Sequence, residues 1–142
     1  VDEEGLFYGF PFQHALNIKD PEFGDIDSGY DYVQPILELG AHVAPTGIAF
    51  YNNNFHFPEE FKNNLFITLH GSWNRSAKVG YKVLRVILNE AGEVTTAEDF
   101  ITGWLQGEKV VGRPSAPLVM SDGSLLISDD KMNVIYRITY TQ

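Results

Sequence analysis

Several side chains capable of polar or stacking chemistry are concentrated in one short connection. The stretch His70-Gly71-Ser72-Trp73-Asn74-Arg75-Ser76 contains an imidazole, an indole, an amide and a guanidinium. A guanidinium pairs well with carboxylates, and an indole offers a flat face for stacking. A hairpin needs none of these groups merely to turn, and sites are commonly built on loops that a rigid sheet holds. The stretch is therefore the first candidate for a functional site.

Two predicted strands position this connection. Side chains over residues 64–70 alternate between an aliphatic face and a face that ends in His70, and this period of two is typical of a strand. Residues 81–88 are apolar at nearly every position except Lys82 and Arg85, which predicts a strand covered on both sides. The candidate residues would therefore lie at one end of a buried antiparallel pair.

The remaining sequence predicts an all-β fold. Residues 48–51 and 94–101 read as two further strands of the same sheet, and Phe57–Phe61 as one helical turn after a turn at residues 52–54. A second, shorter set of strands follows at residues 116–120, 124–128 and 134–140. An approximate repeat of about four short strands is typical of a β-propeller blade.

This repeat predicts part of a propeller and not a closed ring. Residues 1–45 would be the end of a preceding blade with a long loop and an outer strand over residues 32–39, residues 46–103 a complete blade, and residues 104–142 three strands of the last blade. Such an arc exposes unpaired strand edges. We therefore expect an interface along its first or last strand. The partners there would be the remaining blades, in the same protein or in another chain.

Composition excludes several classes of function. The formal net charge is −9 and the pI is near 4.7, which disfavours binding to nucleic acid or to anionic membrane surfaces. Cysteine is absent, so disulfides, thiolate nucleophiles and cysteine zinc sites cannot form. No apolar run is long enough to span a membrane, and the first residues lack the pattern of a secretion signal. Either a signal was removed or the chain begins within a longer protein, and we expect the second.

An acidic stretch near the beginning offers a possible cation site. Asp25, Asp27 and Asp31, with Gly29 between them, resemble half of a calcium-binding loop, in which a tight turn presents several carboxylates. The bidentate Glu that such a loop requires later is Ile36 here. The alternative interpretation is a solvated acidic loop without a metal.

Six phrases of the sequence together resemble the C-terminal part of the glucose/sorbosone dehydrogenases that depend on pyrroloquinoline quinone (PQQ), closest to the sorbosone branch. In chain order these are YGFP (8–11), AHVAPTGIAFY (41–51), LFITLHGSWNRSAKVGYKVLRV (65–86), DFITGW (99–104), GRP (112–114) and DGSLLISDD (122–130). The resemblance implies a six-bladed β-propeller with PQQ and calcium at its axis, a sugar or aldehyde substrate, and a periplasmic or extracellular location. It also implies that the calcium ligands and the catalytic base precede Val1. We therefore expect no catalytic residue here, and no activity from the chain alone.

The resemblance implies that particular residues of this chain contact the cofactor. PQQ is an ortho-quinone with three carboxylates, which guanidinium groups bind well. Arg113, in the GRP phrase, matches a cofactor-contacting arginine, and its alternative is a surface arginine. His70 matches the position of a cofactor-contacting lysine, and its alternative is a structural histidine. His42 matches another cofactor-lining position, and its alternative is a loop histidine with satisfied hydrogen bonds.

The loop after His70 supplies the last two candidates for cofactor binding. Trp73 would offer its face to a sugar or to the quinone, and Arg75 would pair with a carboxylate. The alternatives are that Trp73 clamps the hairpin and that Arg75 lies in water. Asp129 and Asp130 are expected to fix a hairpin by accepting hydrogen bonds from backbone amides.

Two other functional classes compete with the dehydrogenase interpretation. A propeller can serve as a non-catalytic binding or interaction module, because the ring keeps its loops when chemistry is lost. In that case the side chains of His70 and Arg113 need not converge. A calcium-dependent lactonase on a similar propeller would need an axial site rich in carboxylates, and the predicted inner strands supply few acids.

Overall fold

The chain folds almost entirely into short antiparallel strands. The computed structural model describes residues 5–52 and 56–141, and these divide into two units, one up to Leu39 and one from Gly40 onward. The elements are β1 (Gln13–His14), β2 (Ile18–Lys19), β3 (Pro45–Tyr51), the 3-10 turn η1 (Glu59–Phe61), β4 (Asn64–Leu69), β5 (Lys82–Leu88), β6 (Val94–Ile101), β7 (Leu105–Gln106), β8 (Lys109–Val110), β9 (Pro114–Val119), β10 (Leu125–Asp129) and β11 (Val134–Ile138). The predicted all-β fold is confirmed, and the predicted helical turn is η1.

The first unit contains little regular structure. Its strands β1 and β2 form a two-residue antiparallel ladder, and the ring of Phe7 lies against those of Phe12, Tyr30 and Tyr32. The strand predicted over residues 32–39 is wrong, because Tyr32 makes only an isolated bridge to Phe7 and the residues after it form no ladder. Pro35, which lacks an amide donor, lies in the middle of this segment.

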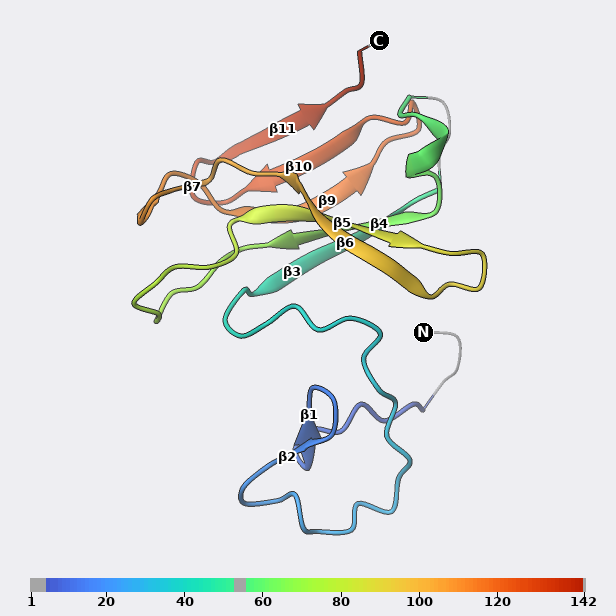
Figure 1. The fold of residues 1–142 in the computed structure, drawn as a ribbon. Helices are drawn as coiled ribbons and strands as arrows, with labels where there is room; N and C mark the ends of the chain where they lie inside the picture. The colour runs from blue at the N-terminus through green and yellow to red at the C-terminus, as the bar shows by residue number, and fades with distance from the viewer. Residues whose placement is uncertain (1–4, 53–55, 142) are drawn as a thin grey trace. The chain divides into compact units, whose positions relative to one another are not determined.

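Four strands of the second unit form one antiparallel sheet in the order β3-β4-β5-β6 (Figure 1). In its centre Ile67 of β4 pairs with Ile48 of β3 and with Leu84 of β5. Every residue of β4 is buried, including both faces of the alternating pattern. The turn predicted at residues 52–54 lies partly outside the described residues. Residues 89–92, between β5 and β6, form a turn in which the Gly92 amide donates to the Asn89 carbonyl at 3.0 Å.

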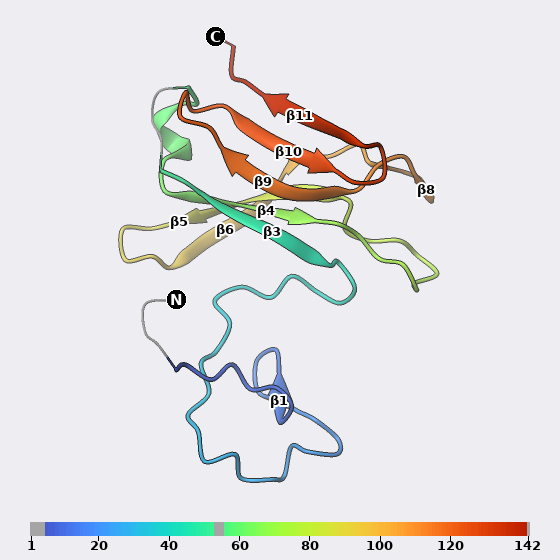
Figure 2. The same cartoon turned by 180° about the vertical axis from the view of Figure 1, so that it is seen from behind.

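A second sheet of three strands, in the order β11-β10-β9, lies beside the first, as both views of the ribbon show (Figures 1 and 2). Its strand β9 contacts β3 and β4. Aromatic and aliphatic side chains fill the core; they are Tyr51, Phe57, Phe66, Tyr81, Val83, Trp104, Leu125 and Ile127. Burial of this apolar surface is the main force that holds the two sheets together.

Two hydroxyl groups also tie the sheets to each other. The Tyr51 hydroxyl, fully buried, donates to the Gly123 carbonyl at 2.8 Å and accepts from the Phe57 amide at 3.1 Å. The Thr68 hydroxyl on β4 lies 2.8 Å from the Ser115 carbonyl on β9. These bonds satisfy buried polar groups and fix how one sheet lies on the other.

No helix within residues 5–52 and 56–141 is long and apolar enough to cross a membrane. The division of the chain into blades of a longer propeller stays a prediction.

The buried hydroxyl of Tyr51 gives a first testable prediction. Replacing Tyr51 with Phe should lower the free energy of unfolding by about 1–3 kcal/mol, because the Gly123 carbonyl and the Phe57 amide would lose their partner inside the protein. Urea titration followed by tryptophan fluorescence measures this change. Tyr30→Phe is the control. Tyr30 is 66% exposed, so removal of its hydroxyl should change the free energy of unfolding little. Equal stability of the two variants would contradict the role assigned to Tyr51.

Candidate functional site

His70 lies immediately after β4, where the sheet ends and the candidate loop begins. The His70 amide donates to the Ala44 carbonyl at 2.9 Å, and the Gly71 amide donates to the Val43 carbonyl at 2.9 Å. These bonds attach the segment that carries His42 to the end of β4. The hydrogen bonding of the sheet therefore continues beyond its last regular pair and orders the loop.

Close packing between Gly71 and Tyr81 fixes the path of this loop. Gly71 has a φ of 98°, and a Cβ added there would lie 2.5 Å from atoms of the Tyr81 ring. Only glycine fits this position, because a side chain would be strained and would overlap the ring. Tyr81 is itself 1% exposed, and its hydroxyl donates to the Ser72 carbonyl. A buried tyrosine thus forms the floor below the loop.

Arg113, from the segment that leads into β9, reaches across to this floor. Its Nη1 lies 3.2 Å from the Gly71 carbonyl and 3.3 Å from Nδ1 of His70. Its Nη2 lies 3.4 Å from both the Ser72 carbonyl and the Tyr81 hydroxyl. The guanidinium carbon is 5.1 Å from the centre of the Tyr81 ring, which is within the range of a cation–π contact. The structure therefore brings Arg113 and His70 into direct contact.

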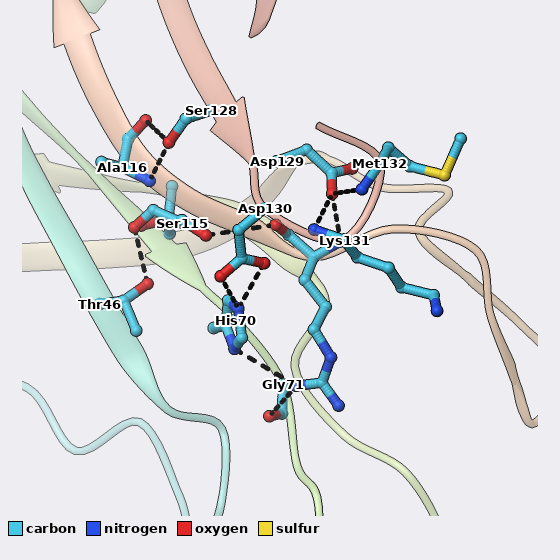
Figure 3. A network of polar contacts seen from close by, with 12 residues as sticks. Thr46, His70, Gly71, Ser115, Ala116, Ser128, Asp129, Asp130, Lys131 and Met132 are labelled. Carbon is cyan, nitrogen blue, oxygen red and sulfur yellow. Dashed lines mark hydrogen bonds and ion pairs between the residues drawn. The ribbon is translucent and has the colours of Figure 1, made fainter. Parts of the chain in front are cut away.

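Both ring nitrogens of His70 are engaged. Nε2 lies 2.9 Å and 3.0 Å from the two carboxylate oxygens of Asp130, and Figure 3 shows His70 between Asp130 and Gly71. An arginine can only donate, so Nδ1 of His70 must accept from Arg113 and Nε2 must carry the proton that Asp130 accepts. The hydrogen bond from His70 lowers the pKa of the Asp130 carboxyl. Carboxylate, imidazole and guanidinium thus form one chain of contacts.

Asp129, next to Asp130, holds the backbone around the site. Its carboxylate accepts from the amides of Arg113 (2.9 Å), Lys131 (3.1 Å) and Met132 (2.9 Å) and from the Tyr136 hydroxyl (3.1 Å). Figure 3 shows its contacts with Lys131 and Met132. Burial raises the pKa of the Asp129 carboxyl, but these donors outweigh burial and hold the pKa below its ordinary value of 3.8. The expectation for Asp129 is confirmed.

The expectation for Asp130 is wrong. Its carboxylate binds the His70 ring, whereas backbone amides of the hairpin go to Asp129. Asp130 and Tyr81 are therefore site residues that the sequence interpretation missed. The consecutive carboxylates indicated the turn, but no local pattern indicated His70 as the partner of Asp130.

Arg113 differs from Arg85 and Arg137 in its electrostatic partners. Arg85 lies 3.1 Å from Glu98, and Arg137 is paired with Asp122. Within the described residues no carboxylate lies within ion-pair distance of the Arg113 guanidinium, which is held by neutral oxygens and a ring nitrogen at 3.2–3.4 Å. Typical hydrogen bonds of this kind are shorter, near 2.9 Å. A partly buried cation without a counter-ion is a suitable partner for an anionic ligand.

The other predicted site residues lie on the surface around this group. His42 is exposed and has a φ of 66°. Arg75 is exposed and donates to the Ala41 carbonyl at 3.3 Å, so it lies beside the loop of His42. Trp73 is 83% exposed and therefore does not clamp the hairpin by burial. Their assignment to cofactor binding stays a prediction.

The acidic stretch near the beginning does not form a metal site among the described residues. Asp25 is paired with Lys19 at 2.7 Å, and Asp27 accepts from the Gly29 amide at 2.9 Å. In the part of the chain that the structure describes, no three acidic or histidine side chains are placed to hold a metal ion. The interpretation as a solvated acidic loop agrees with this arrangement.

Comparison with known proteins identifies the family. The model of the TrAA12-like family matches residues 5–141, which is nearly the whole chain. This chain belongs to the TrAA12-like family. It is also 41% identical, over 99% of its length, to an uncharacterized protein of Borreliella burgdorferi, of which it covers 38%.

Two solved structures share the fold of this TrAA12-like chain. One is the holo form of the pyranose dehydrogenase PQQ domain from Coprinopsis cinerea, with 29% identity, a TM-score of 0.61, and coverage of 77% of this chain and 30% of that one. The other is the calcium structure of the Trichoderma reesei Carbohydrate-Active Enzymes family AA12, with 23% identity, a TM-score of 0.68, and coverage of 90% and 37%. The chain thus spans 30–38% of the length of these relatives.

These relatives confirm the predicted resemblance to PQQ-dependent sugar dehydrogenases at the level of the family. Placement closest to the sorbosone branch stays a prediction.

Asp129 gives a prediction for stability and its dependence on pH. Asp129→Asn should lower the free energy of unfolding at pH 7 by about 2–4 kcal/mol, because an amide cannot accept all the hydrogen bonds that the carboxylate accepts. A carboxyl whose pKa is lowered in the folded state stabilises the fold above its unfolded-state pKa, and this contribution is lost as pH falls. The wild-type advantage over Asp129→Asn should therefore shrink as pH falls below the ordinary value of 3.8.

Thermal unfolding of both proteins between pH 7 and the lowest pH at which they fold reversibly measures this prediction. Asp20→Asn is the control, because Asp20 also accepts from backbone amides in a turn, but these hydrogen bonds are exposed. A constant difference between wild type and Asp129→Asn at all pH values would contradict the assignment.

Proposed function

We propose that this chain is the C-terminal part of a PQQ-dependent dehydrogenase of sugars or aldehydes, of the glucose/sorbosone type, and that it supplies residues that bind the cofactor. The observation that carries the proposal is the guanidinium of Arg113, which has no carboxylate partner among the described residues although the protein has a net charge of −9. Membership of the TrAA12-like family and similarity to a pyranose dehydrogenase PQQ domain support it.

The donors present fit a group that carries carboxylates. Arg113 is partly buried, its four contacts are long, and neutral carbonyls hold it in place without neutralising its charge. A carboxylate placed against it would gain a charge-assisted hydrogen bond that the folded chain does not already provide. PQQ, when bound, supplies the quinone that accepts the electrons of the substrate.

The residues of this chain have separate roles in the proposal. Arg113 binds a cofactor carboxylate. His70, with both nitrogens engaged, contacts the cofactor only if it exchanges one of these partners, so its main role is to hold Arg113. Trp73, Arg75 and His42 are exposed and are proposed to line the approach to the cofactor, where an indole face suits a sugar ring.

The rest of the proposed enzyme lies outside this chain. We place the catalytic base and the calcium ligands in preceding blades of the propeller, and the protein in the periplasm or outside the cell. The partners of this chain are then the remaining blades, in the same protein or in another chain. The alternative of a non-catalytic binding module gains no support, because His70 and Arg113 converge.

Binding of PQQ to the full-length protein that carries this chain tests the proposal. Arg113→Gln should weaken binding by roughly 10- to 150-fold, because a hydrogen bond to a charged group is worth about 1.5–3 kcal/mol. Isothermal titration with PQQ in the presence of calcium measures the change. Arg137→Gln is the matched control, since it removes an arginine that already has a carboxylate partner, Asp122.

If the wild-type protein fails to bind PQQ, or if Arg113→Gln and Arg137→Gln bind it equally well, the proposed function is wrong. If PQQ binds as proposed, dye reduction that depends on an added sugar or aldehyde identifies the substrate class.

A further inference from the structure

We propose that Asp130 is a positioning residue that acts on Arg113 through His70. Asp130 would select the ring tautomer of His70 that accepts a hydrogen bond from Arg113 and thereby hold the guanidinium in its binding orientation. This inference rests on the proposed function only for the identity of the ligand. The chain of contacts itself is a property of the protein without ligand.

The geometry leaves one tautomer of His70 compatible with both neighbours. Arg113 offers only N–H groups, so Nδ1, at 3.3 Å from its Nη1, must present a lone pair. The proton then lies on Nε2, at 2.9 Å and 3.0 Å from the oxygens of Asp130, which as a carboxylate can only accept. With the proton on Nδ1 instead, two N–H groups would face each other and the contact with Arg113 would be lost.

Asp130 is well placed for this role. The His70 side chain is 21% exposed and is held between partners, whereas the Asp130 side chain is 61% exposed and reaches back over the ring from the turn after β10. A carboxylate that binds the far nitrogen of a histidine commonly fixes its tautomer and ring orientation. Among the described residues, Asp130 contacts His70 and the Ser115 side chain but not the Arg113 guanidinium, and the guanidinium itself contacts His70, so the imidazole is the link between them.

The two consecutive aspartates act on different parts of Arg113, its backbone and its side chain. Asp129 accepts from the Arg113 backbone amide at 2.9 Å and so fixes where the arginine leaves the chain. Asp130, through His70, fixes where its side chain ends. Replacement of Asp130 should therefore change the site while the hairpin held by Asp129 stays intact.

The first test reads the tautomer directly, without any cofactor. In the full-length protein labelled with nitrogen-15 at histidine, the ring nitrogen shifts of His70, assigned by their loss in His70→Gln, should show a proton on Nε2. Asp130→Asn should shift the population toward Nδ1–H, because the new amide can donate to Nε2. Asp130→Glu should retain the wild-type tautomer. An Nδ1–H tautomer in the wild type, or no change in Asp130→Asn, would overturn the proposal.

The second test measures coupling through PQQ affinity. Asp130→Asn should raise the dissociation constant of PQQ about tenfold, which is the lower end of the effect of replacing the carboxylate behind a metal-ligating histidine. In a His70→Ala background the same change should have an effect of less than about twofold, because the connecting ring is gone. Asp99→Asn is the control, since Asp99 is half-exposed and pairs with Lys82 on the sheet.

The outcomes separate this inference from the proposed function. An equal effect of Asp130→Asn in both backgrounds would show direct action and overturn the role of His70. Failure of the wild type to bind PQQ would refute the proposed function and the ligand named here, whereas the tautomer test would still decide whether Asp130 positions His70.

Discussion

The candidate site depends on the contact between one guanidinium and the floor formed by Tyr81 and the carbonyls of Gly71 and Ser72. Arg113 is held at 3.2–3.4 Å by neutral groups, and no carboxylate among the described residues neutralises it. A partly buried cation of this kind costs solvation free energy that the protein recovers only in part. Such an arrangement favours an anion supplied from outside, and this is the physical basis of the proposed function.

The apolar core and the hydrogen bonds between the two sheets fix their relative position, and this position brings Arg113 to Tyr81. His70 and Tyr81 belong to the connection between β4 and β5, whereas Arg113 precedes β9 of the other sheet. Tyr51, Thr68 and the aromatic core fix the position of one sheet on the other, and this brings the two halves of the site together. Precision at the site is thus a consequence of the inter-sheet core.

Much of the fold could be predicted from the sequence, because local patterns encode it. The strands that became β4, β5 and β6 follow from alternation and β-branched residues, and the turns at Asn89 and Asp122 follow from residues that bond their own backbone. The strand predicted over residues 32–39 failed, because periodicity alone does not supply a neighbouring strand to pair with.

The site could be predicted only in part. His70 and Arg113 were identified by family resemblance, but the position of Asp130 on His70 joins residues 60 apart in the chain, and no local pattern encodes such a pairing. Tyr81 was predicted only as the first residue of a strand. Its position below the loop after His70 depends on the close approach of Gly71 to its ring, which the sequence does not reveal. Trp73, Arg75 and His42 were also predicted to bind the cofactor, but they are exposed, and their role stays a prediction.

The most direct measurement is an experimental structure of the full-length protein with PQQ bound. The account predicts that a carboxylate of the cofactor lies within hydrogen-bond distance of the Arg113 guanidinium, while His70 still connects Arg113 to Asp130. A structure in which PQQ binds elsewhere, or in which Arg113 is paired with a carboxylate of the protein itself, would contradict it.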